Sequence, residues 1–322
     1  MTKNFFLGCT YNFLQPEDDA PPLRRFEMVR NAGVFDYINW LPPPPILKDC
    51  IAASEKTGIP MTTTNCSYQL GQDGPDLLDH VRTAGAVEAE LLNVMLRATA
   101  ADGHELTDRE IIDTYARAAE LGASLDVEVS FELHVDCWSE KYKRVTPVIE
   151  AARAEDLTFH FTLDYSHVVF KIENLEQQRI SEVEDDVAAG RVVLDPFEEG
   201  SLCEEWLGLN AVRFAQFRPV VPNNPLNVWA KAPDGSLPRG IMYPFTRPAP
   251  GEWHSPWFAH RLSACKEAFR KVLAHHLADP ASPLKYVITE MIASPDYGLN
   301  AKFSLFEHNV AAAAWIRRTW SR

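Results

Sequence analysis

The hydrophobic residues of this chain follow two patterns that alternate from one end to the other. Short apolar runs rich in β-branched and aromatic residues are typical of strands, and they are separated by longer stretches with apolar positions every three or four residues, typical of amphipathic helices. The short runs predict strands at residues 5–9, 35–39, 60–64, 91–96, 127–132, 159–164, 212–217 and 286–291. The longer pattern predicts helices at residues 23–31, 46–56, 77–87, 108–121, 142–154, 257–276 and 305–320.

Successive strand–helix units predict a parallel sheet, and eight such units close a (β/α)₈ TIM barrel. The last two intervals between strands are longer than the others and predict insertions at residues 171–209 and 219–256. Neither insertion contains much periodic apolar sequence, so residues 1–322 are interpreted as one domain. The second insertion is rich in proline and tryptophan, and because it follows the seventh strand we expect it to form a lid over the C-terminal face of the barrel.

Charge and cysteine content narrow the classes of partner. The chain has 31 basic and 45 acidic residues, a formal net charge of −14, which disfavours nucleic acid and anionic membranes. No apolar run approaches the roughly 20 residues that a membrane-spanning helix needs. The six cysteines are scattered without a CxxC pair, which favours reduced thiols and a cytoplasmic location over a disulfide framework or a zinc site.

Side chains with carboxylate or amide oxygens come at the ends of four consecutive predicted strands. Alternation along each strand places them in phase with the residues that face the barrel axis: Glu132, Asp164, Gln216 and Glu290. Three carboxylates that converge in one mouth repel each other unless a positive charge lies among them. Such an oxygen-rich set favours one divalent cation, Mn²⁺ or Mg²⁺ before zinc. The alternative is that these carboxylates are solvated or are paired with cations such as Arg218 and Lys302.

Three short motifs carry a resemblance to a known superfamily: Phe131-Glu132-Leu133-His134, Leu163-Asp164-Tyr165-Ser166-His167 and Ile288-Thr289-Glu290. Together with the strand order, they resemble the xylose isomerase-like TIM-barrel superfamily of sugar isomerases and epimerases. The resemblance implies that Glu132, Asp164 and Glu290 bind a divalent metal, Mn²⁺ or Mg²⁺ with Co²⁺ or Zn²⁺ as alternatives, and that His167 contacts the substrate. Gln216 departs from the pattern, because it stands where the superfamily has a metal-binding histidine, but its side chain still offers a carbonyl oxygen.

The activity that the resemblance implies is proton transfer next to a carbonyl group, through an enediolate that the metal stabilises. Glu132 and Glu290 are then the acid–base pair. His134, in phase with Glu132, is an additional candidate base, although a structural histidine is an equally good interpretation. The expected substrate is a small carbohydrate or another hydroxy-carbonyl compound, and a homo-oligomer or a partner subunit is left open.

Other residues near the predicted mouth are candidates for substrate binding. Arg218 can bind a substrate carboxylate or hydroxyl group, or it can simply balance the carboxylates. The aromatic side chains of Tyr37, Trp40 and Trp138 suit stacking against a sugar ring, although each is equally suited to packing. His254 flanks the tryptophans of the second insertion and is a further candidate.

Two other functions compete with a sugar isomerase or epimerase. A metal-dependent lyase, of the dehydratase type or of the type that cleaves a C-glycoside of an oxidised sugar, begins with the same proton abstraction. A non-catalytic barrel that binds a sugar is the second alternative. An endonuclease of the same fold is disfavoured because its zinc cluster needs histidines on the early strands, and none occurs at residues 8–10 or 62–65.

Overall fold

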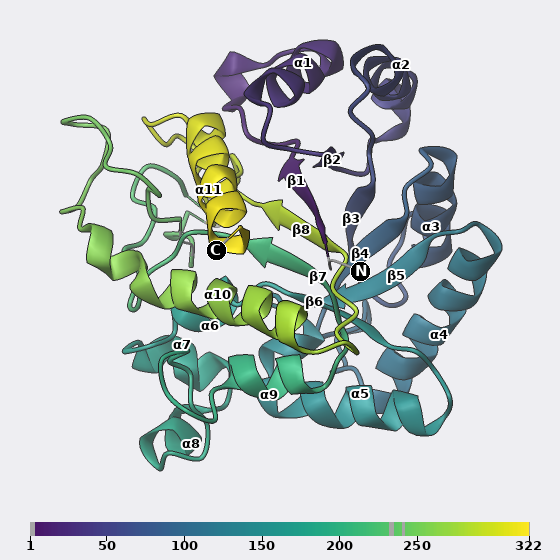
Figure 1. The fold of residues 1–322 in the computed structure, drawn as a ribbon. Coiled ribbons are helices and arrows are strands. Elements are labelled where there is room, and N and C mark those ends of the chain that lie inside the picture. The colour runs from purple at the N-terminus through teal and green to yellow at the C-terminus, as the bar shows by residue number, and fades with distance from the viewer. Residues whose placement is uncertain (1–3, 232–234, 240–241, 322) are drawn as a thin grey trace.

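Parallel strands form a closed barrel at the centre of the computed structural model, which describes residues 4–231, 235–239 and 242–321 (Figure 1). The strands follow one another around the barrel in chain order, and β8 closes it on β1 through pairs from Phe6 with Tyr286 to Cys9 with Thr289. The predicted (β/α)₈ TIM barrel is confirmed. The strands are β1 (Phe6–Thr10), β2 (Tyr37–Asn39), β3 (Thr63–Tyr68), β4 (Leu91–Leu96), β5 (Glu128–Glu132), β6 (His160–Leu163), β7 (Val212–Phe217) and β8 (Tyr286–Thr289).

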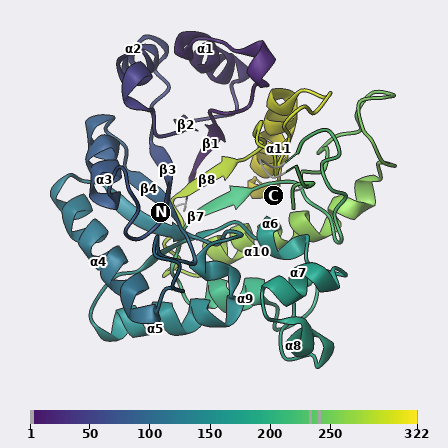
Figure 2. The same ribbon diagram turned by 180° about the vertical axis from the view of Figure 1, so that it is seen from behind.

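Helices surround the barrel on its outer side (Figure 2). Local hydrogen bonds and backbone conformation set where these helices begin and end. Helix α4 begins at a capping box in which the side chains of Thr107 and Glu110 each accept a hydrogen bond from the other's backbone N–H, and α1 ends where Gly33 takes a left-handed conformation with φ of 66°. The long helices are α1 (Pro22–Ala32), α2 (Leu47–Thr57), α3 (Leu77–Ala86), α4 (Asp108–Ser124), α5 (Val145–Ala154), α10 (Ser263–Ala278) and α11 (Leu305–Trp320).

The interval between β6 and β7 contains short helices that the apolar pattern did not predict. They are α6 (Ser166–Val169), α7 (Leu175–Ile180), α8 (Glu184–Ala188) and α9 (Leu202–Gly208). Helices of four to seven residues complete two turns at most, so they leave almost no amphipathic period in the sequence. By contrast, the described residues of the second insertion, 219–231, 235–239 and 242–256, form neither helix nor strand.

Two predicted elements are shifted along the chain. Strand β3 runs from Thr63 to Tyr68 instead of residues 60–64, because each of its residues pairs with a residue of β4, from Leu91 to Leu96. The helix predicted at residues 257–276 begins only at Ser263, after a turn of 3₁₀ helix. The remaining strand predictions agree with the structure to within about two residues, which is the usual uncertainty of element ends.

A layer of apolar side chains fills the barrel interior: Tyr37, Leu91, Phe214, Tyr286 and Ile288. Tyr37 was expected to contact the substrate, but the structure contradicts this expectation. The Tyr37 side chain is fully buried in the layer, and its hydroxyl donates a hydrogen bond to the carbonyl oxygen of Val287 at 2.8 Å. It is therefore part of the floor of the barrel.

Trp138 was also expected near the substrate, and the structure contradicts this expectation too. Its side chain is fully buried, and its ring meets Phe159 edge-on with 6.3 Å between the ring centroids. Trp138 and Phe159 belong to the large hydrophobic core that joins the strands to the surrounding helices. Trp138 therefore contributes packing and not a surface for a ligand.

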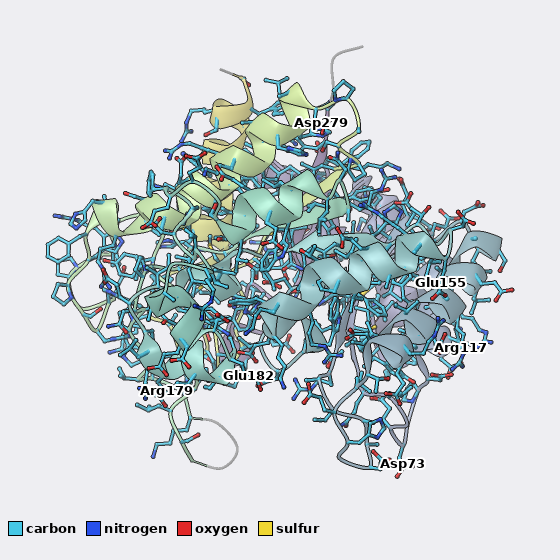
Figure 3. The ribbon with its side chains drawn as sticks, turned by 90° about the horizontal axis from the view of Figure 1, so that it is seen from below. Asp73, Arg117, Glu155, Arg179, Glu182 and Asp279 are labelled. Carbon is cyan, nitrogen blue, oxygen red and sulfur yellow. The ribbon has the colours of Figure 1, made fainter. Side chains whose placement is uncertain are left out.

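Charged side chains lie at the outer edge of the molecule. Asp73, Arg117 and Glu155 are examples that are exposed to solvent (Figure 3). Among the described residues, no helix combines the length and the apolar composition needed to cross a membrane.

The floor of the barrel generates a first prediction, because Gly8 of β1 lies directly against the Tyr37 ring. A Cβ atom at position 8 would lie 2.3 Å from Cε2 of Tyr37, which is far inside van der Waals contact. We expect Gly8→Ala to lower the free energy of unfolding by about 1–3 kcal/mol through overpacking, measured by urea denaturation. Gly208→Ala is the matched control, since a Cβ there meets nothing within 4 Å, and equal stability of the two variants would contradict the prediction.

Candidate active site

Four oxygen-bearing side chains lie at the C-terminal ends of adjacent strands, as the alternation predicted. Glu132 is the last residue of β5 and Gln216 lies in β7, while Asp164 and Glu290 directly follow β6 and β8. All four are buried, and Glu290 is the most exposed at 8%. The register pairs Glu132 with the residue two positions before Asp164, and Gln216 with the residue two positions before Glu290. Barrel closure therefore brings the four side chains to one mouth.

The surroundings of the three carboxyl groups disfavour their charged forms. Burial, followed by the negative charges of Glu290 and Asp164, raises the pKa of Glu132 well above its usual value, although Asn93 donates a hydrogen bond to it. Burial also raises the pKa of Asp164, although Arg218 opposes the shift. Burial and the charge of Asp164 raise the pKa of Glu290 to about 8. Without a further cation, burial and mutual repulsion therefore favour the protonated forms of these groups.

Arg218 supplies the positive charge inside this mouth. Its Nε donates a hydrogen bond to Ser166 Oγ at 2.7 Å, and its Nη2 lies 2.9 Å from His167 Nε2 and 3.3 Å from Asp164 Oδ2. The Asp164 carboxylate also accepts a hydrogen bond from the Ser166 backbone N–H at 3.0 Å. Arg218 and His167 were both predicted to bind substrate. Arg218 contacts the His167 ring as well as the carboxylate of Asp164.

His134 is held in one tautomer by its two hydrogen bonds. Its Nδ1 lies 2.7 Å from the carbonyl oxygen of Val135, and its Nε2 lies 2.9 Å from Oη of Tyr297. Because a carbonyl oxygen only accepts, Nδ1 carries the proton and Nε2 accepts a hydrogen bond from the Tyr297 hydroxyl. Burial lowers the pKa of His134 to about 4, which keeps the ring neutral. With both nitrogens engaged, His134 holds Tyr297 and has no lone pair left to act as a base.

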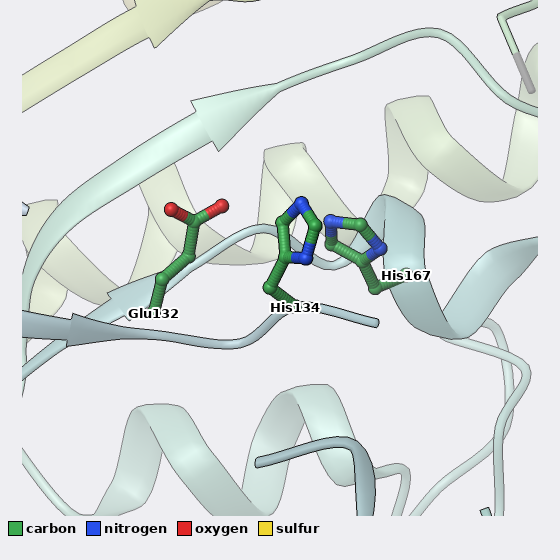
Figure 4. A group of neighbouring side chains, drawn as sticks. All are labelled: Glu132, His134 and His167. Atoms are coloured by element: carbon green, nitrogen blue, oxygen red, sulfur yellow. The ribbon is translucent and has the colours of Figure 1, made fainter. Parts of the chain in front are cut away.

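Glu132, His134 and His167 form a compact group of metal-ligating residue types, with one ligand atom of each within 4.8 Å of the others (Figure 4). This group shares only Glu132 with the predicted metal ligands. In Figure 4 the two imidazole rings lie next to each other beyond the Glu132 carboxylate. Both rings are already engaged, His134 by Tyr297 and His167 by the guanidinium of Arg218. The compact group would therefore have to break these contacts to hold an ion.

Three of the predicted ligands instead have an oxygen atom without a hydrogen bond from the described residues, although Oδ2 of Asp164 lies 3.3 Å from Nη2 of Arg218. Oδ2 of Asp164, Oε1 of Gln216 and Oε2 of Glu290 are buried, and the described residues offer none of them a hydrogen bond. Buried oxygens without a partner are costly, and a cation that prefers oxygen ligands would satisfy them. The donor set consequently fits a hard divalent cation such as Mn²⁺ or Mg²⁺ better than it fits zinc.

The other two predicted binding residues pack against aromatic rings. Trp40, just after β2, stacks on Tyr11 with 3.8 Å between ring centroids and 2° between the ring planes. His254 lies between Trp229 and Trp253, with ring centroids 4.7 Å and 4.3 Å away. His254 and these tryptophans line a pocket that Tyr297 also lines. Tyr297 therefore connects this pocket to the residues around Arg218.

The second insertion contacts segments that follow three different strands. Asn227 donates hydrogen bonds to the carbonyl oxygens of Pro295 and Leu299 in the loop after β8, at 3.3 Å and 3.0 Å. Arg239 donates hydrogen bonds to Asp136 at 3.0 Å, after β5, and to Gln177 at 2.7 Å, after β6. Figure 1 shows this green segment on the side towards which the arrowheads of β7 and β8 point.

Arg239 also pairs with a buried carboxylate, Glu140. Lys171 donates a second hydrogen bond to Glu140, at 2.6 Å. Although burial raises the pKa of Glu140, Lys171 and Arg239 outweigh it and lower this pKa to about 2. Glu140 is therefore charged near neutral pH, and it joins the loop after β5 to both insertions.

Sequence reasoning missed several residues of the site, above all Tyr297 and Asn93. Asn93 is a polar residue in the middle of the apolar run of β4, two positions from the interior residue Leu91, so its inward direction was detectable. Tyr297 lies in the irregular loop between β8 and α11, where no periodicity indicates a direction. Ser166 lies within a predicted motif, but nothing in the sequence pairs it with Arg218.

No family model matches the sequence, and no curated protein matches it. Among solved structures, the fold is similar to D-allulose 3-epimerase from Methylomonas sp., with a TM-score of 0.56 and 10% identity over 98% of each chain. It is also similar to 3-keto-D-glucoside 4-epimerase from E. coli, with a TM-score of 0.52 and 12% identity over 98% of this chain and 100% of that one.

A third similar structure is a xylose isomerase-like TIM barrel protein from Mycobacterium smegmatis in complex with magnesium, with a TM-score of 0.53 and 10% identity over 98% of each chain. The fold is thus that of xylose isomerase-like TIM barrels, which confirms the resemblance noted in the sequence. Similarity at these identities shows the fold alone, and the activity has to be argued from the site.

The contacts of Arg239 generate a second prediction, on the mobility of the second insertion. Arg239→Met removes the ion pairs to Asp136 and Glu140 but leaves Glu140 paired with Lys171. We expect faster amide hydrogen exchange in residues 219–256 and unchanged exchange in the barrel strands, measured by mass spectrometry. Arg179→Met is the control, because it removes only an exposed pair with Glu184. Unchanged exchange of residues 219–256 in Arg239→Met would show that the insertion is held by other contacts.

Proposed function

We propose that this protein is a divalent-metal-dependent sugar isomerase or epimerase that transfers a proton at a carbon next to a carbonyl group. The observation that carries the proposal is the set Glu132, Asp164, Gln216 and Glu290, which is buried at the ends of β5 to β8. In this set Asp164, Gln216 and Glu290 each keep an oxygen atom without a hydrogen bond from the described residues. Two proteins with similar folds are sugar epimerases by name, which supports the same class of reaction. The proposed setting is the cytoplasm, since all six cysteines are buried and unpaired.

Charge balance supports a divalent cation at this set. Three carboxylates face one guanidinium, that of Arg218, so the ionised cluster has two negative charges in excess. Glu132, Asp164, Gln216 and Glu290 would hold the ion, and the oxygen ligands favour Mn²⁺ or Mg²⁺. When bound, such an ion supplies a Lewis acid that polarises substrate oxygens. The magnesium complex of a similar fold is consistent with this choice.

The proton is moved by Glu132 and Glu290, which come from strands separated by β6 and β7. Each carboxyl group lies in a site where burial opposes its charged form, so each can take a proton from carbon and return it. One residue removes the proton and the other delivers one to the neighbouring carbon or to the opposite face. Arg218 and His167 orient the substrate by hydrogen bonds to its oxygens.

A lyase would share the first proton abstraction, but no observation favours it over an isomerase or epimerase. The two are separated by their products, because an isomerase or epimerase releases neither water nor an aglycone. A non-catalytic sugar-binding barrel likewise has no observation in its favour.

The proposed metal site gives a third prediction. After treatment with EDTA, the protein is expected to bind one Mn²⁺ in a calorimetric titration. A free Mn²⁺ concentration of 100 times the Kd should raise the free energy of unfolding by about 2.7 kcal/mol. Gln216→Leu removes an oxygen donor and should weaken binding by about tenfold or more. Absence of Mn²⁺ binding by the wild type would contradict the metal site.

The choice of variants separates the two possible ligand sets. His134→Asn should leave Mn²⁺ affinity within about threefold of wild type, because His134 belongs only to the compact group with Glu132 and His167. If His134→Asn weakens binding and Gln216→Leu does not, the ion is held by the compact group instead. Both variants leave the carboxylates in place, so a difference between them reports on the ligands.

A fourth prediction concerns the chemistry. Glu290→Gln keeps an oxygen atom for the metal but cannot accept a proton, so turnover should fall by more than about a hundredfold while the fold is retained. A panel of ketohexoses that includes D-allulose is incubated in D₂O, and incorporation of deuterium at carbon is followed by NMR. The wild type should incorporate deuterium into the sugar that it converts, and Glu290→Gln should not.

The matched control is Glu198→Gln. Glu198 is exposed and does not belong to the mouth, so this variant should behave as wild type. The Mn²⁺ affinity of Glu290→Gln is measured in parallel, so that loss of the metal is not mistaken for loss of the base. Conversion that is insensitive to Glu290→Gln and occurs without incorporation of deuterium would overturn the proposed proton transfer.

A further inference from the structure

Tyr297 occupies a central position among the site residues, although it is neither a carboxylate nor a predicted ligand. It lies in the loop between β8 and α11, and its side chain is nine-tenths buried. One side of its ring faces the guanidinium of Arg218, with Cζ of Arg218 4.2 Å from the ring centroid. Its hydroxyl donates a hydrogen bond to Nε2 of His134. The two contacts use different parts of the same side chain.

The loop that presents Tyr297 is fixed from several directions. Gln15 donates a hydrogen bond to the carbonyl oxygen of Gly298 at 2.8 Å, and Ala293 donates one to the carbonyl oxygen of Asn12 at 2.9 Å. Gly298 has no room for a side chain, because a Cβ atom would lie 2.5 Å from Cε of Met242. Tyr297 therefore reaches the mouth from a backbone that is packed against both the β1 loop and the second insertion.

The contacts of Arg218 show what the ring of Tyr297 does. The Nε atom of Arg218 is bound by Ser166, and Nη2 faces His167 and Asp164. Within the described part of the chain, Nη1 has no hydrogen-bond acceptor. An aromatic face stabilises a guanidinium by a cation–π interaction and leaves its N–H groups available, because those groups lie in the guanidinium plane. The ring thus supports Arg218 while one of its NH₂ groups stays available for a substrate oxygen.

We propose that Tyr297 is a positioning residue that acts through Arg218: its ring fixes the guanidinium over the mouth, and His134 fixes the ring through the hydroxyl. His134, which has no free nitrogen, is then part of the support and not a base. The inference rests on the proposed function only for its kinetic consequence, namely that Arg218 binds a substrate oxygen. The position of Arg218 itself can be tested without any substrate.

The experiment uses the Nε–H signal of Arg218 in ¹⁵N NMR spectra of the full chain, assigned by its absence in Arg218→Lys. Buried and bound to Ser166, this proton should exchange slowly with solvent in the wild type. Tyr297→Leu and Tyr297→Met remove the aromatic face, and the exchange should become faster by about tenfold or more. Tyr297→Phe keeps the face but loses the hydrogen bond to His134, and the exchange should be faster than in the wild type but slower than in Tyr297→Leu.

An internal reference distinguishes local from general effects. Arg25 is another buried arginine over a tyrosine ring, 4.8 Å from the centroid of Tyr11, and its Nε–H is bound by the carbonyl oxygen of Ala20. The exchange rate of the Arg25 Nε–H should not change in any Tyr297 variant. Wild-type exchange of Arg218 in both Tyr297→Leu and Tyr297→Met would overturn the proposal, as would an equal acceleration at Arg25 and Arg218. Two variants are used so that one that fails to fold does not decide the outcome.

A kinetic arm tests the consequence for the reaction, with whichever sugar of the ketohexose panel the wild type converts. Tyr297→Leu should raise KM about tenfold or more, as Arg218→Lys should, and the double variant should be no worse than Arg218→Lys alone. Additive effects of the two substitutions would contradict a role through Arg218. If the wild type converts no sugar, the proposed function fails, while the NMR result still decides the role of Tyr297.

Discussion

The burial of three carboxyl groups around one guanidinium is the constraint on which the rest of this structure depends. An ionised carboxylate in an interior costs several kcal/mol unless it is paired or satisfied by hydrogen bonds. Arg218 offers only one positive charge to Glu132, Asp164 and Glu290, and the protein compensates the remainder with raised pKa values. The same imbalance that destabilises the mouth favours the uptake of a cation or of protons there.

Barrel closure makes this arrangement possible, because it directs the C-terminal ends of all strands to one face. The interior then divides into a floor and a mouth. Tyr37, Phe214 and Tyr286 form the apolar floor, and the polar residues lie further along the same strands: Gln216 comes two positions after Phe214, and Glu290 comes four positions after Tyr286. The alternation that identifies inward-facing residues does not by itself distinguish floor from mouth. This is why Tyr37 was assigned to the substrate although it packs against Gly8.

The parts of the site that were predictable from the sequence are those set by strand geometry. Glu132, Asp164, Gln216 and Glu290 lie on four strands with a period of two, so their common direction is a local property that any correct strand assignment contains. Tyr297 and Arg239 lie in irregular loops, and their directions depend on contacts with residues far away in the chain: His134 is 163 positions from Tyr297, and Glu140 is 99 positions from Arg239. The short helices α6 to α9 escaped prediction for a related reason, since two turns carry almost no periodic signal.

The pair Gln216 and Arg218 shows how the site accommodates its departure from the pattern that the sequence resembles. A guanidinium close to Asp164 competes with a cation for the same oxygens, and a bidentate pair would remove Asp164 as a ligand. The structure limits this contact to a single ion pair: Arg218 is bound through Nε by Ser166, and its Nη2 lies 3.3 Å from Oδ2 of Asp164 without a hydrogen bond. The neutral amide of Gln216 adds an oxygen but no further charge. Because Ser166 holds Arg218 through Nε, the guanidinium stays short of a hydrogen bond to Oδ2 of Asp164, and this oxygen remains available to an ion at the strand ends.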